Sequence, residues 1–157
     1  MREARVFGLL PLRLFYEGDH ATVLGKAFSS FWAGWSALGL PSYGMIRLET
    51  VGRKSGKVHA LAVVVAHWCG ESFLVSMLGE CAWVRNVRAH PEVVLFRYRR
   101  RRVRLEEVPV AQRAPIIQAY LRVAPGARPH IGLRADASLA DCEQVAASHP
   151  VFRIVPP

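Results

Sequence analysis

The chain has 157 residues, and a domain of that length buries roughly 68–70% of its unfolded surface. Hydrophobic residues make up 52% of the sequence, so the core needs neither disulfide bonds nor a metal ion to be stable. The formal net charge is +9, from 21 lysines and arginines against 12 acidic residues. A balance this basic favours an anionic partner without identifying it.

The three cysteines, Cys69, Cys81 and Cys142, are an odd number without metal-ligand spacing. We expect free thiols in a reducing cytoplasm and no metal site. The sequence contains no run of about 18 uncharged apolar residues, so we expect no transmembrane helix. Residues 1–14 resemble a weak signal peptide, but their apolar core is short and no small-residue cleavage site follows. We interpret them as part of the mature protein.

The first predicted element is an amphipathic helix over residues 19–38, within an N-terminal helical extension of about residues 1–40. Asp19 can cap its start, and Gly39 with Pro41 marks its end. Apolar side chains recur at three- and four-residue intervals, at Leu24, Phe28, Phe31, Trp35 and Leu38. The helix either packs across the rest of the domain or forms a lid whose Trp32 and Trp35 touch a ligand or a membrane surface.

Short strands dominate the remainder of the chain. Apolar and β-branched runs predict strands at about 43–51, 57–66, 72–77, 92–98, 102–108 and 151–155. Helical spacing predicts helices at about 81–89, 109–123 and 138–147. The segment 125–129, which contains two prolines and a glycine, breaks the second of these helices. Six short strands with few peripheral helices favour a single small, mostly antiparallel barrel.

A cationic turn, Gly52–Lys57, lies between the first two of these strands. Its two glycines, Gly52 and Gly56, allow the backbone to take positive φ so that amides can converge. Arg53 and Lys54 add positive charge, and Ser55 adds a hydroxyl donor. Donor-rich concavities of this kind suit phosphate or carboxylate. The alternative is a basic hairpin turn that only faces water.

A second basic feature is the run Arg97–Arg104, with six arginines and one interleaved tyrosine. A hairpin that carries it could lie along the phosphates of a nucleic acid. No stacking set of aromatic residues accompanies it, so a solvated face is the favoured interpretation.

Three segments carry a family resemblance. Leu48–Lys57 is similar to the pattern L-x-T-x-G-R-K-S-G, and Trp83–Pro91 to W-x-x-N-L-x-A-x-P preceded by a strand-end Ser and a Gly, here Ser76 and Gly79. Pro150–Ile154 resembles a closing strand. Together they resemble the deazaflavin-dependent nitroreductase family, split β-barrel oxidoreductases related to the FMN-binding pyridoxamine-phosphate-oxidase barrels. The resemblance implies one domain, residues 1–157, built on a six-stranded antiparallel split β-barrel.

The resemblance also implies a cofactor, coenzyme F420, which is an 8-hydroxy-5-deazaflavin with a phosphate and an oligoglutamate tail. The residues that would hold its phosphate or tail carboxylates are Arg53, Lys54, Ser55, Gly56 and Lys57. Asn86 matches a cofactor-contacting asparagine. Trp83 matches an aromatic residue that either packs near the ring system or fills the core. Ser76 matches a serine near the deazaflavin, its alternative being a hydroxyl bonded to backbone.

One loop departs from the family pattern. Where many members have a Gly-Gly-x-x-Lys loop after the serine, this chain has the shorter Met77–Cys81, in which Glu80 brings the opposite charge. Arg85 or Arg88 could supply the missing cation. A tyrosine that many members place after the tryptophan is Val84 here.

The activity that the resemblance implies is hydride transfer from the reduced deazaflavin to an enone, a quinone or a nitro compound. The proton would come from solvent, from Ser76 or from Tyr120, although Tyr120 also fits a core position. The alternative is a split barrel that binds FMN, haem or a fatty acid. Barrels of this type commonly pair, so a homodimer is one expectation, and the N-terminal helix could contact a membrane peripherally.

Overall fold

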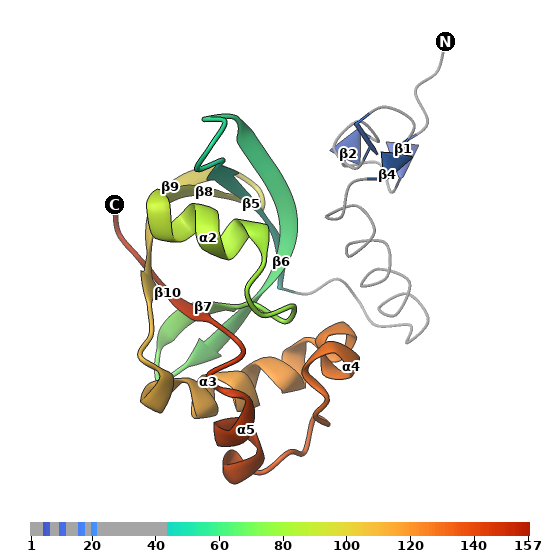
Figure 1. The fold of residues 1–157 in the computed structure, drawn as a ribbon, viewed down its shortest axis with the longest axis vertical. Coiled ribbons are helices and arrows are strands. Elements are labelled where there is room, and N and C mark those ends of the chain that lie inside the picture. Colours follow the sequence, from blue (N-terminus) through green and yellow to red (C-terminus); the bar gives the residue numbers. More distant parts are fainter. Residues whose placement is uncertain (1–4, 7–9, 12–15, 18–19, 22–43) are drawn as a thin grey trace. The chain divides into compact units, whose positions relative to one another are not determined.

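A computed structural model of the chain describes residues 5–6, 10–11, 16–17, 20–21 and 44–157 (Figure 1). The chain forms two compact units, residues 1–39 and 40–157. In the first unit, β1 (Arg5–Val6) pairs with β2 (Leu10–Pro11), and β3 (Tyr16–Glu17) pairs with β4 (His20–Ala21).

The helix predicted over residues 19–38 is wrong at its start. His20 and Ala21 pair with Glu17 and Tyr16 as antiparallel strand residues, and backbone in a ladder cannot also be helical. The rest of that prediction, including Trp32 and Trp35, lies outside the described residues.

Six antiparallel strands close into a barrel in the order β10–β7–β6–β5–β8–β9. This confirms the fold class that the sequence predicts. The strands are β5 (Met45–Val51), β6 (Val58–Trp68), β7 (Glu71–Val75), β8 (Glu92–Phe96), β9 (Arg100–Glu107) and β10 (Val151–Val155). The last strand, β10, pairs with β7 on one side and with β9 on the other, so it completes the ring.

The helix α2 (Ala82–Ala89) presses its apolar side into the barrel core (Figure 1). Its Trp83, Val84 and Val87 are buried in one cluster with residues from the strands around them. The Trp83 and Phe152 rings lie with their centroids 5.5 Å apart, within the range of favourable aromatic pairs. The helix is therefore fixed to β10 as well as to β5.

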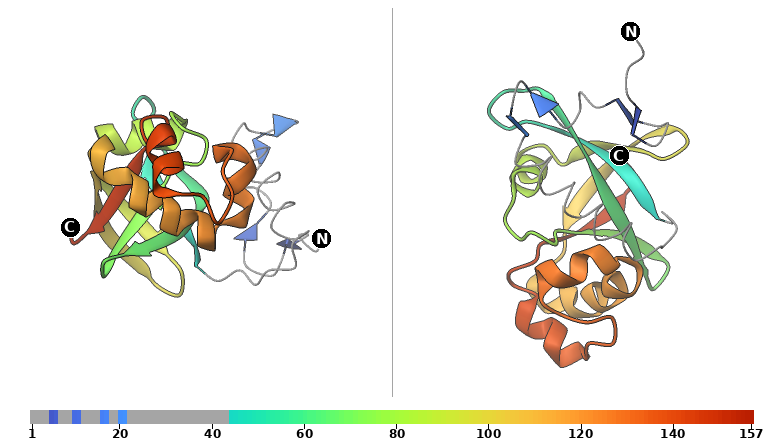
Figure 2. Two further views of the ribbon diagram at one scale, coloured as in Figure 1. Left: turned by 90° about the horizontal axis from the view of Figure 1, so that it is seen from below. Right: turned by 90° about the vertical axis from the view of Figure 1, so that its right-hand side faces the viewer.

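The remaining helices gather on one side of the strands (Figure 2). They are α3 (Val110–Val123), the 3-10 turn η2 (Pro125–Ala127), α4 (Arg128–Ile131) and α5 (Leu139–Val145). The predicted break after α3 is present, but the sequence analysis missed the two short helical turns within it. Proline suits the first turn of a helix, and Pro125 and Pro129 each stand at one of the first two positions of these turns. None of the helices that the structure describes is long and apolar enough to cross a membrane.

The β6–β7 hairpin turns through Cys69 and Gly70, between the paired residues Trp68 and Glu71. Both turn residues have positive φ, 49° for Cys69 and 77° for Gly70. Two-residue hairpins favour this left-handed geometry because it matches the twist of the strands, but it normally selects Asn, Asp or Gly at the first position. Cys69 is an exposed free thiol, and Cys81 and Cys142 are free as predicted.

The left-handed backbone of Cys69 predicts a stabilising substitution. Asn tolerates this conformation better than other non-glycine residues, so Cys69→Asn should raise the free energy of unfolding by up to about 1 kcal/mol. Cys69→Val should lower it, because a β-branched side chain strains most in this region. Urea unfolding of the two variants tests the order, and equal stability would contradict the turn geometry.

Candidate functional site

Two backbone hydrogen bonds close the Gly52–Lys57 turn, and its cationic side chains are exposed to solvent. The Gly52 amide donates to the Lys57 carbonyl at 2.7 Å, and the Gly56 amide donates to the Gly52 carbonyl at 2.8 Å. Gly56 takes positive φ, 66°, as predicted. Gly52 does not, so that part of the expectation is wrong. Space around it is limited instead, since a Cβ there would lie 2.6 Å from Ser55 Oγ and 2.8 Å from His59 Nε2, and these side chains would have to move.

Donors surround the outside of this turn. Arg53, Lys54, Ser55 and Lys57 are all exposed. The Ser55 hydroxyl oxygen accepts from the Lys57 amide at 3.3 Å, which leaves the hydroxyl proton available. Within the described residues, the amides of Lys54 and Ser55 donate to no other group. Two adjacent amides with three cationic side chains make a surface suited to an anion.

Asn86 joins this turn to helix α2. Its Oδ1 accepts from the Arg53 amide at 3.2 Å and from Arg53 Nη1 at 3.4 Å. Asn86 is buried, with 6% of its surface exposed, whereas the neighbouring Arg85 is exposed on the same helix. The structure thus brings together residues that the sequence places 33 positions apart. Its Oδ1 is committed to positioning Arg53.

Ser76 lies in a separate cluster, at the end of β7. It is 1% exposed, and its hydroxyl donates to the Gly79 carbonyl at 2.7 Å. A hydroxyl has one proton, so the 3.4 Å contact with Cys81 Sγ requires the thiol to donate. The backbone-bonded alternative describes this hydroxyl, and within the described residues no hydrogen bond joins Ser76 to the cationic turn.

His149 also contacts this loop, and the sequence analysis missed it. The ring is buried, and its Nδ1 lies 2.9 Å from the Ser76 carbonyl, which can only accept, so Nδ1 carries the proton. Gly79, at φ 67°, packs close to the residue before His149, since a Cβ at Gly79 would lie 2.9 Å from the Ser148 carbonyl oxygen. A single histidine before a proline carries no sequence signal that would single it out.

Trp83 and Tyr120, the two aromatic candidates, are both core residues. Trp83 is 6% exposed and belongs to the barrel cluster, so the core interpretation describes its position. Tyr120, on α3, is 3% exposed, and burial raises the pKa of its phenol, which therefore stays protonated at neutral pH.

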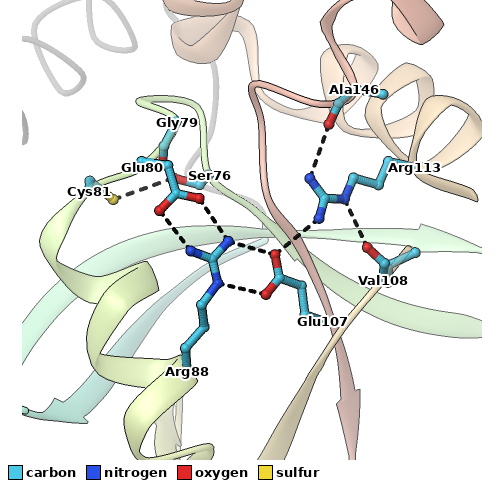
Figure 3. Close-up of polar contacts among 9 residues, drawn as sticks. All are labelled: Ser76, Gly79, Glu80, Cys81, Arg88, Glu107, Val108, Arg113 and Ala146. Carbon is cyan, nitrogen blue, oxygen red and sulfur yellow. Dashed lines mark hydrogen bonds and ion pairs between the residues drawn. The ribbon is translucent and has the colours of Figure 1, made fainter. Parts of the chain in front are cut away.

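Arg88 is not a free cation for a phosphate, contrary to one of the two alternatives drawn from the sequence. Both of its terminal nitrogens donate to Glu80 at 2.7 Å, and its Nε and Nη2 donate to Glu107 at 2.7 Å (Figure 3). The Glu80 carboxylate is therefore the ion-pair partner of Arg88. Hydrogen bonds from Arg88 hold the pKa of Glu80 and of Glu107 below their usual range.

Arg113 extends this network into the helical layer. Its Nη2 donates to Glu107 Oε1 at 3.0 Å, its Nε to the Val108 carbonyl at 2.8 Å and its Nη1 to the Ala146 carbonyl at 3.1 Å (Figure 3). The Glu107 carboxylate thus connects Arg88 on α2 with Arg113 on α3, and Arg113 in turn bonds to the end of α5. Arg113 is 6% exposed, and full pairing is what makes a buried guanidinium tolerable.

The fold defines the class, a split-barrel protein. One solved structure, described as a domain-swapped dimer, is 17% identical, covers 73% of this chain and 81% of that chain, and has a TM-score of 0.51. A protein of unknown function from Agrobacterium tumefaciens is 15% identical, covers 70% of this chain and 47% of that chain, and has a TM-score of 0.53. At such identities the likeness concerns the fold.

The family follows from the sequence match. The family described as F420H(2)-dependent quinone reductase matches residues 33–130, well over half of the sequence. The chain belongs to the F420H(2)-dependent quinone reductase family. A solved F420-H2 dependent reductase is 17% identical, covers 71% of this chain and 94% of that chain, and has a TM-score of 0.49. Among curated proteins none matches.

Asn86 provides a direct test of the link between α2 and the turn. Asn86→Ala should leave the part-buried Arg53 amide without an acceptor, lowering the free energy of unfolding by about 1–2 kcal/mol. It should also speed hydrogen exchange of the Arg53 amide. Asn86→Asp keeps an acceptor in the same place and should retain that amide's protection. Equal exchange in the two variants would contradict the proposed anchoring.

The Arg88 network predicts acid-sensitive stability. The folded-state pKa values of Glu80 and Glu107 are lowered, so their contribution is complete above the unfolded value near 4.5 and is lost as pH falls through the folded values. Arg88→Met should lower the free energy of unfolding by about 1 kcal/mol at pH 7, since the groups are partly exposed. The gap from wild type should shrink as the pH approaches 3.

Urea unfolding at several pH values measures this gap. Arg122→Met, on the exposed side of α3, is the matched control and should differ little from wild type at any pH. A gap between wild type and Arg88→Met that stays constant from pH 7 to pH 3 would show that the two carboxylates are not the source of the effect.

Proposed function

We propose that this protein binds coenzyme F420 and reduces an electron-poor small molecule such as a quinone, an enone or a nitro compound. Membership of the F420H(2)-dependent quinone reductase family supports the reductase class. The observation that carries the cofactor assignment is the anchored cationic turn, with Arg53 bonded to Asn86 and two amides free of partners within the described residues. Such donors fit a phosphate or a string of carboxylates.

In this proposal the turn holds the anionic part of the cofactor. Arg53, Lys54 and Lys57 contribute charge, Ser55 a hydroxyl and the loop amides fixed dipoles, while Gly56 supplies the left-handed backbone that closes the turn onto Gly52. Asn86 acts on the cofactor through Arg53. Arg85, exposed on the same helix as Asn86, is the remaining cation available to the site.

The cofactor, when bound, supplies the hydride. For the proton we favour solvent. Ser76 donates its only proton to Gly79, and Tyr120 is buried with a raised pKa. We assign Ser76 to shaping the loop between β7 and α2, and Trp83 to holding α2 against the barrel. Whether Ser76 or Tyr120 reaches substrate stays a prediction from the sequence.

We also propose that the barrel pairs into a homodimer. One solved structure of the same fold, described as a domain-swapped dimer, supports this pairing. Light scattering of the purified chain decides between monomer and dimer, and a monomeric mass at micromolar concentration would remove this part of the proposal.

A fluorescence titration with coenzyme F420, beside FMN, tests the cofactor assignment. We expect saturable binding of F420 that weakens with added salt, because the contacts are ionic. Arg53→Ala with Lys54→Ala should weaken binding about tenfold to a hundredfold, or about 1.4–2.8 kcal/mol for the two contacts together, because solvent weakens charge-assisted contacts at an exposed turn.

The matched control removes two positive charges elsewhere, by Arg122→Ala with Arg134→Ala, and should bind F420 nearly as wild type does. Unchanged affinity in the turn variant would remove the turn from the site. Binding of FMN, haem or a fatty acid in place of F420 would mean that the barrel holds another ligand.

A further inference from the structure

The hairpin that joins β8 to β9 carries an unusual concentration of arginine. We call residues 96–104 the arginine hairpin. Its strand partners are Phe96 with Arg100, Leu95 with Arg101 and Val94 with Arg102. Inside the barrel β9 buries Val103 and Leu105, so the alternating residues Arg100, Arg102 and Arg104 face outward. Residues 97–99 form the exposed tip.

Most of this charge has no carboxylate partner within residues 44–157. Arg100 pairs with Glu49, a carboxylate that it shares with Arg47. Among residues 44–157, no carboxylate lies within ion-pair distance of the other five, Arg97, Arg99, Arg101, Arg102 and Arg104. Five guanidinium groups on one short hairpin create a strong local positive potential. This potential comes from the hairpin's own residues and does not depend on the cationic turn.

Aromatic side chains stand among these arginines. Tyr98, at the tip, is 87% exposed, and Phe96 is 40% exposed. The Arg97 guanidinium carbon lies 5.4 Å from the centroid of the Tyr98 ring, within the range of a cation–π contact, and the ring stays largely open to solvent. An exposed aromatic ring lowers solubility. Its place among the arginines of the tip indicates that the partner's surface attracts positive charge and also accommodates an amphipathic ring.

The arginine hairpin is distant from the cationic turn. On β5, Arg47 pairs with Phe96 and Glu49 with Val94, while the turn begins after Val51 at the other end of that strand. At about 3.3 Å per residue, the hairpin tip lies on the order of 20 Å from the turn. Figure 2 shows the β8–β9 hairpin and the β5–β6 turn pointing away from each other. The two basic regions are therefore separate surfaces.

We propose that the arginine hairpin docks on the surface of an anionic phospholipid bilayer. The arginines meet lipid phosphates, and Tyr98 and Phe96 enter the headgroup region, where amphipathic rings are favoured. A nucleic acid fits the same charge less well. Single-stranded nucleic acids bind along a series of aromatic rings on which successive bases stack, and the exposed tip, residues 97–99, has one such ring, Tyr98.

Vesicle co-sedimentation of the full chain tests the proposal. The probes are vesicles of phosphatidylcholine alone and vesicles that also contain about 30% phosphatidylglycerol. Each is used at about 50 mM and at about 300 mM salt, because screening of surface charges increases strongly between these concentrations. We expect binding only to the anionic vesicles and mostly at the lower salt. Because each arginine near such a surface contributes roughly a fivefold change in partitioning, Arg99→Gln with Arg102→Gln should lower binding about 25-fold.

Two further variants isolate the hairpin. Arg122→Gln with Arg134→Gln has the same net charge and should bind vesicles nearly as wild type does. Tyr98→Ser should lower binding a few-fold without changing its dependence on salt, because the ring carries no charge. Unchanged thermal unfolding and F420 titration in the hairpin variants establish that folding and the proposed cofactor site are intact.

Three results would overturn the proposal: no binding of wild-type protein to anionic vesicles, equal binding by the hairpin variant and its charge-matched control, or hairpin-dependent binding to a DNA or RNA oligonucleotide in place of vesicles. Each is independent of whether the protein uses F420.

Discussion

The pairing of β10 with two neighbours is the constraint on which the rest of the structure depends. β7 and β9 are separated by more than twenty residues, and only the final strand bridges them into a closed ring. Phe152 on that strand packs against Trp83, which seats α2 in the core. The Val151 carbonyl also accepts from the Val108 amide, so the strand orders the connection into the helical layer. Closure removes the exposed strand edges that an open sheet would present.

From that closure the position of the cationic turn follows by a short series of contacts. The packing of Trp83 sets the axis of α2, and one turn later Asn86 reaches out of the core to the Arg53 amide. Helix packing buries this asparagine, and its Oδ1 holds the Arg53 end of the turn. On the other side of α2, Arg88 reaches Glu107 and through it Arg113. A short amphipathic helix thus transmits the geometry of the barrel to its surface in two directions.

The sequence predicts the strands and the closing role of β10 well, because apolar alternation and turn residues are local signals. Residues Arg53 and Asn86 were both candidates, but their hydrogen bond required the folded chain. The same holds for Glu80, whose charge looked unfavourable until its partner Arg88 was in place. His149 and Arg113 were missed, since one buried polar residue carries no periodic signal. At Gly52 the expected left-handed backbone is absent, and what crowds a side chain there is the pair Ser55 and His59, which a strand-and-turn pattern does not reveal.

The register of β5 places the cationic turn and the arginine hairpin far enough apart to evolve independently. Effects of substitutions at sites more than 7–10 Å apart, without shared partners, are usually additive. The cationic turn and the arginine hairpin stand at opposite ends of one rigid strand, and Arg100 shares its carboxylate with Arg47 rather than with any residue of the turn. Selection can therefore alter the charge at one end without an energetic penalty at the other, and a designer can treat the two ends as independent modules on a common scaffold.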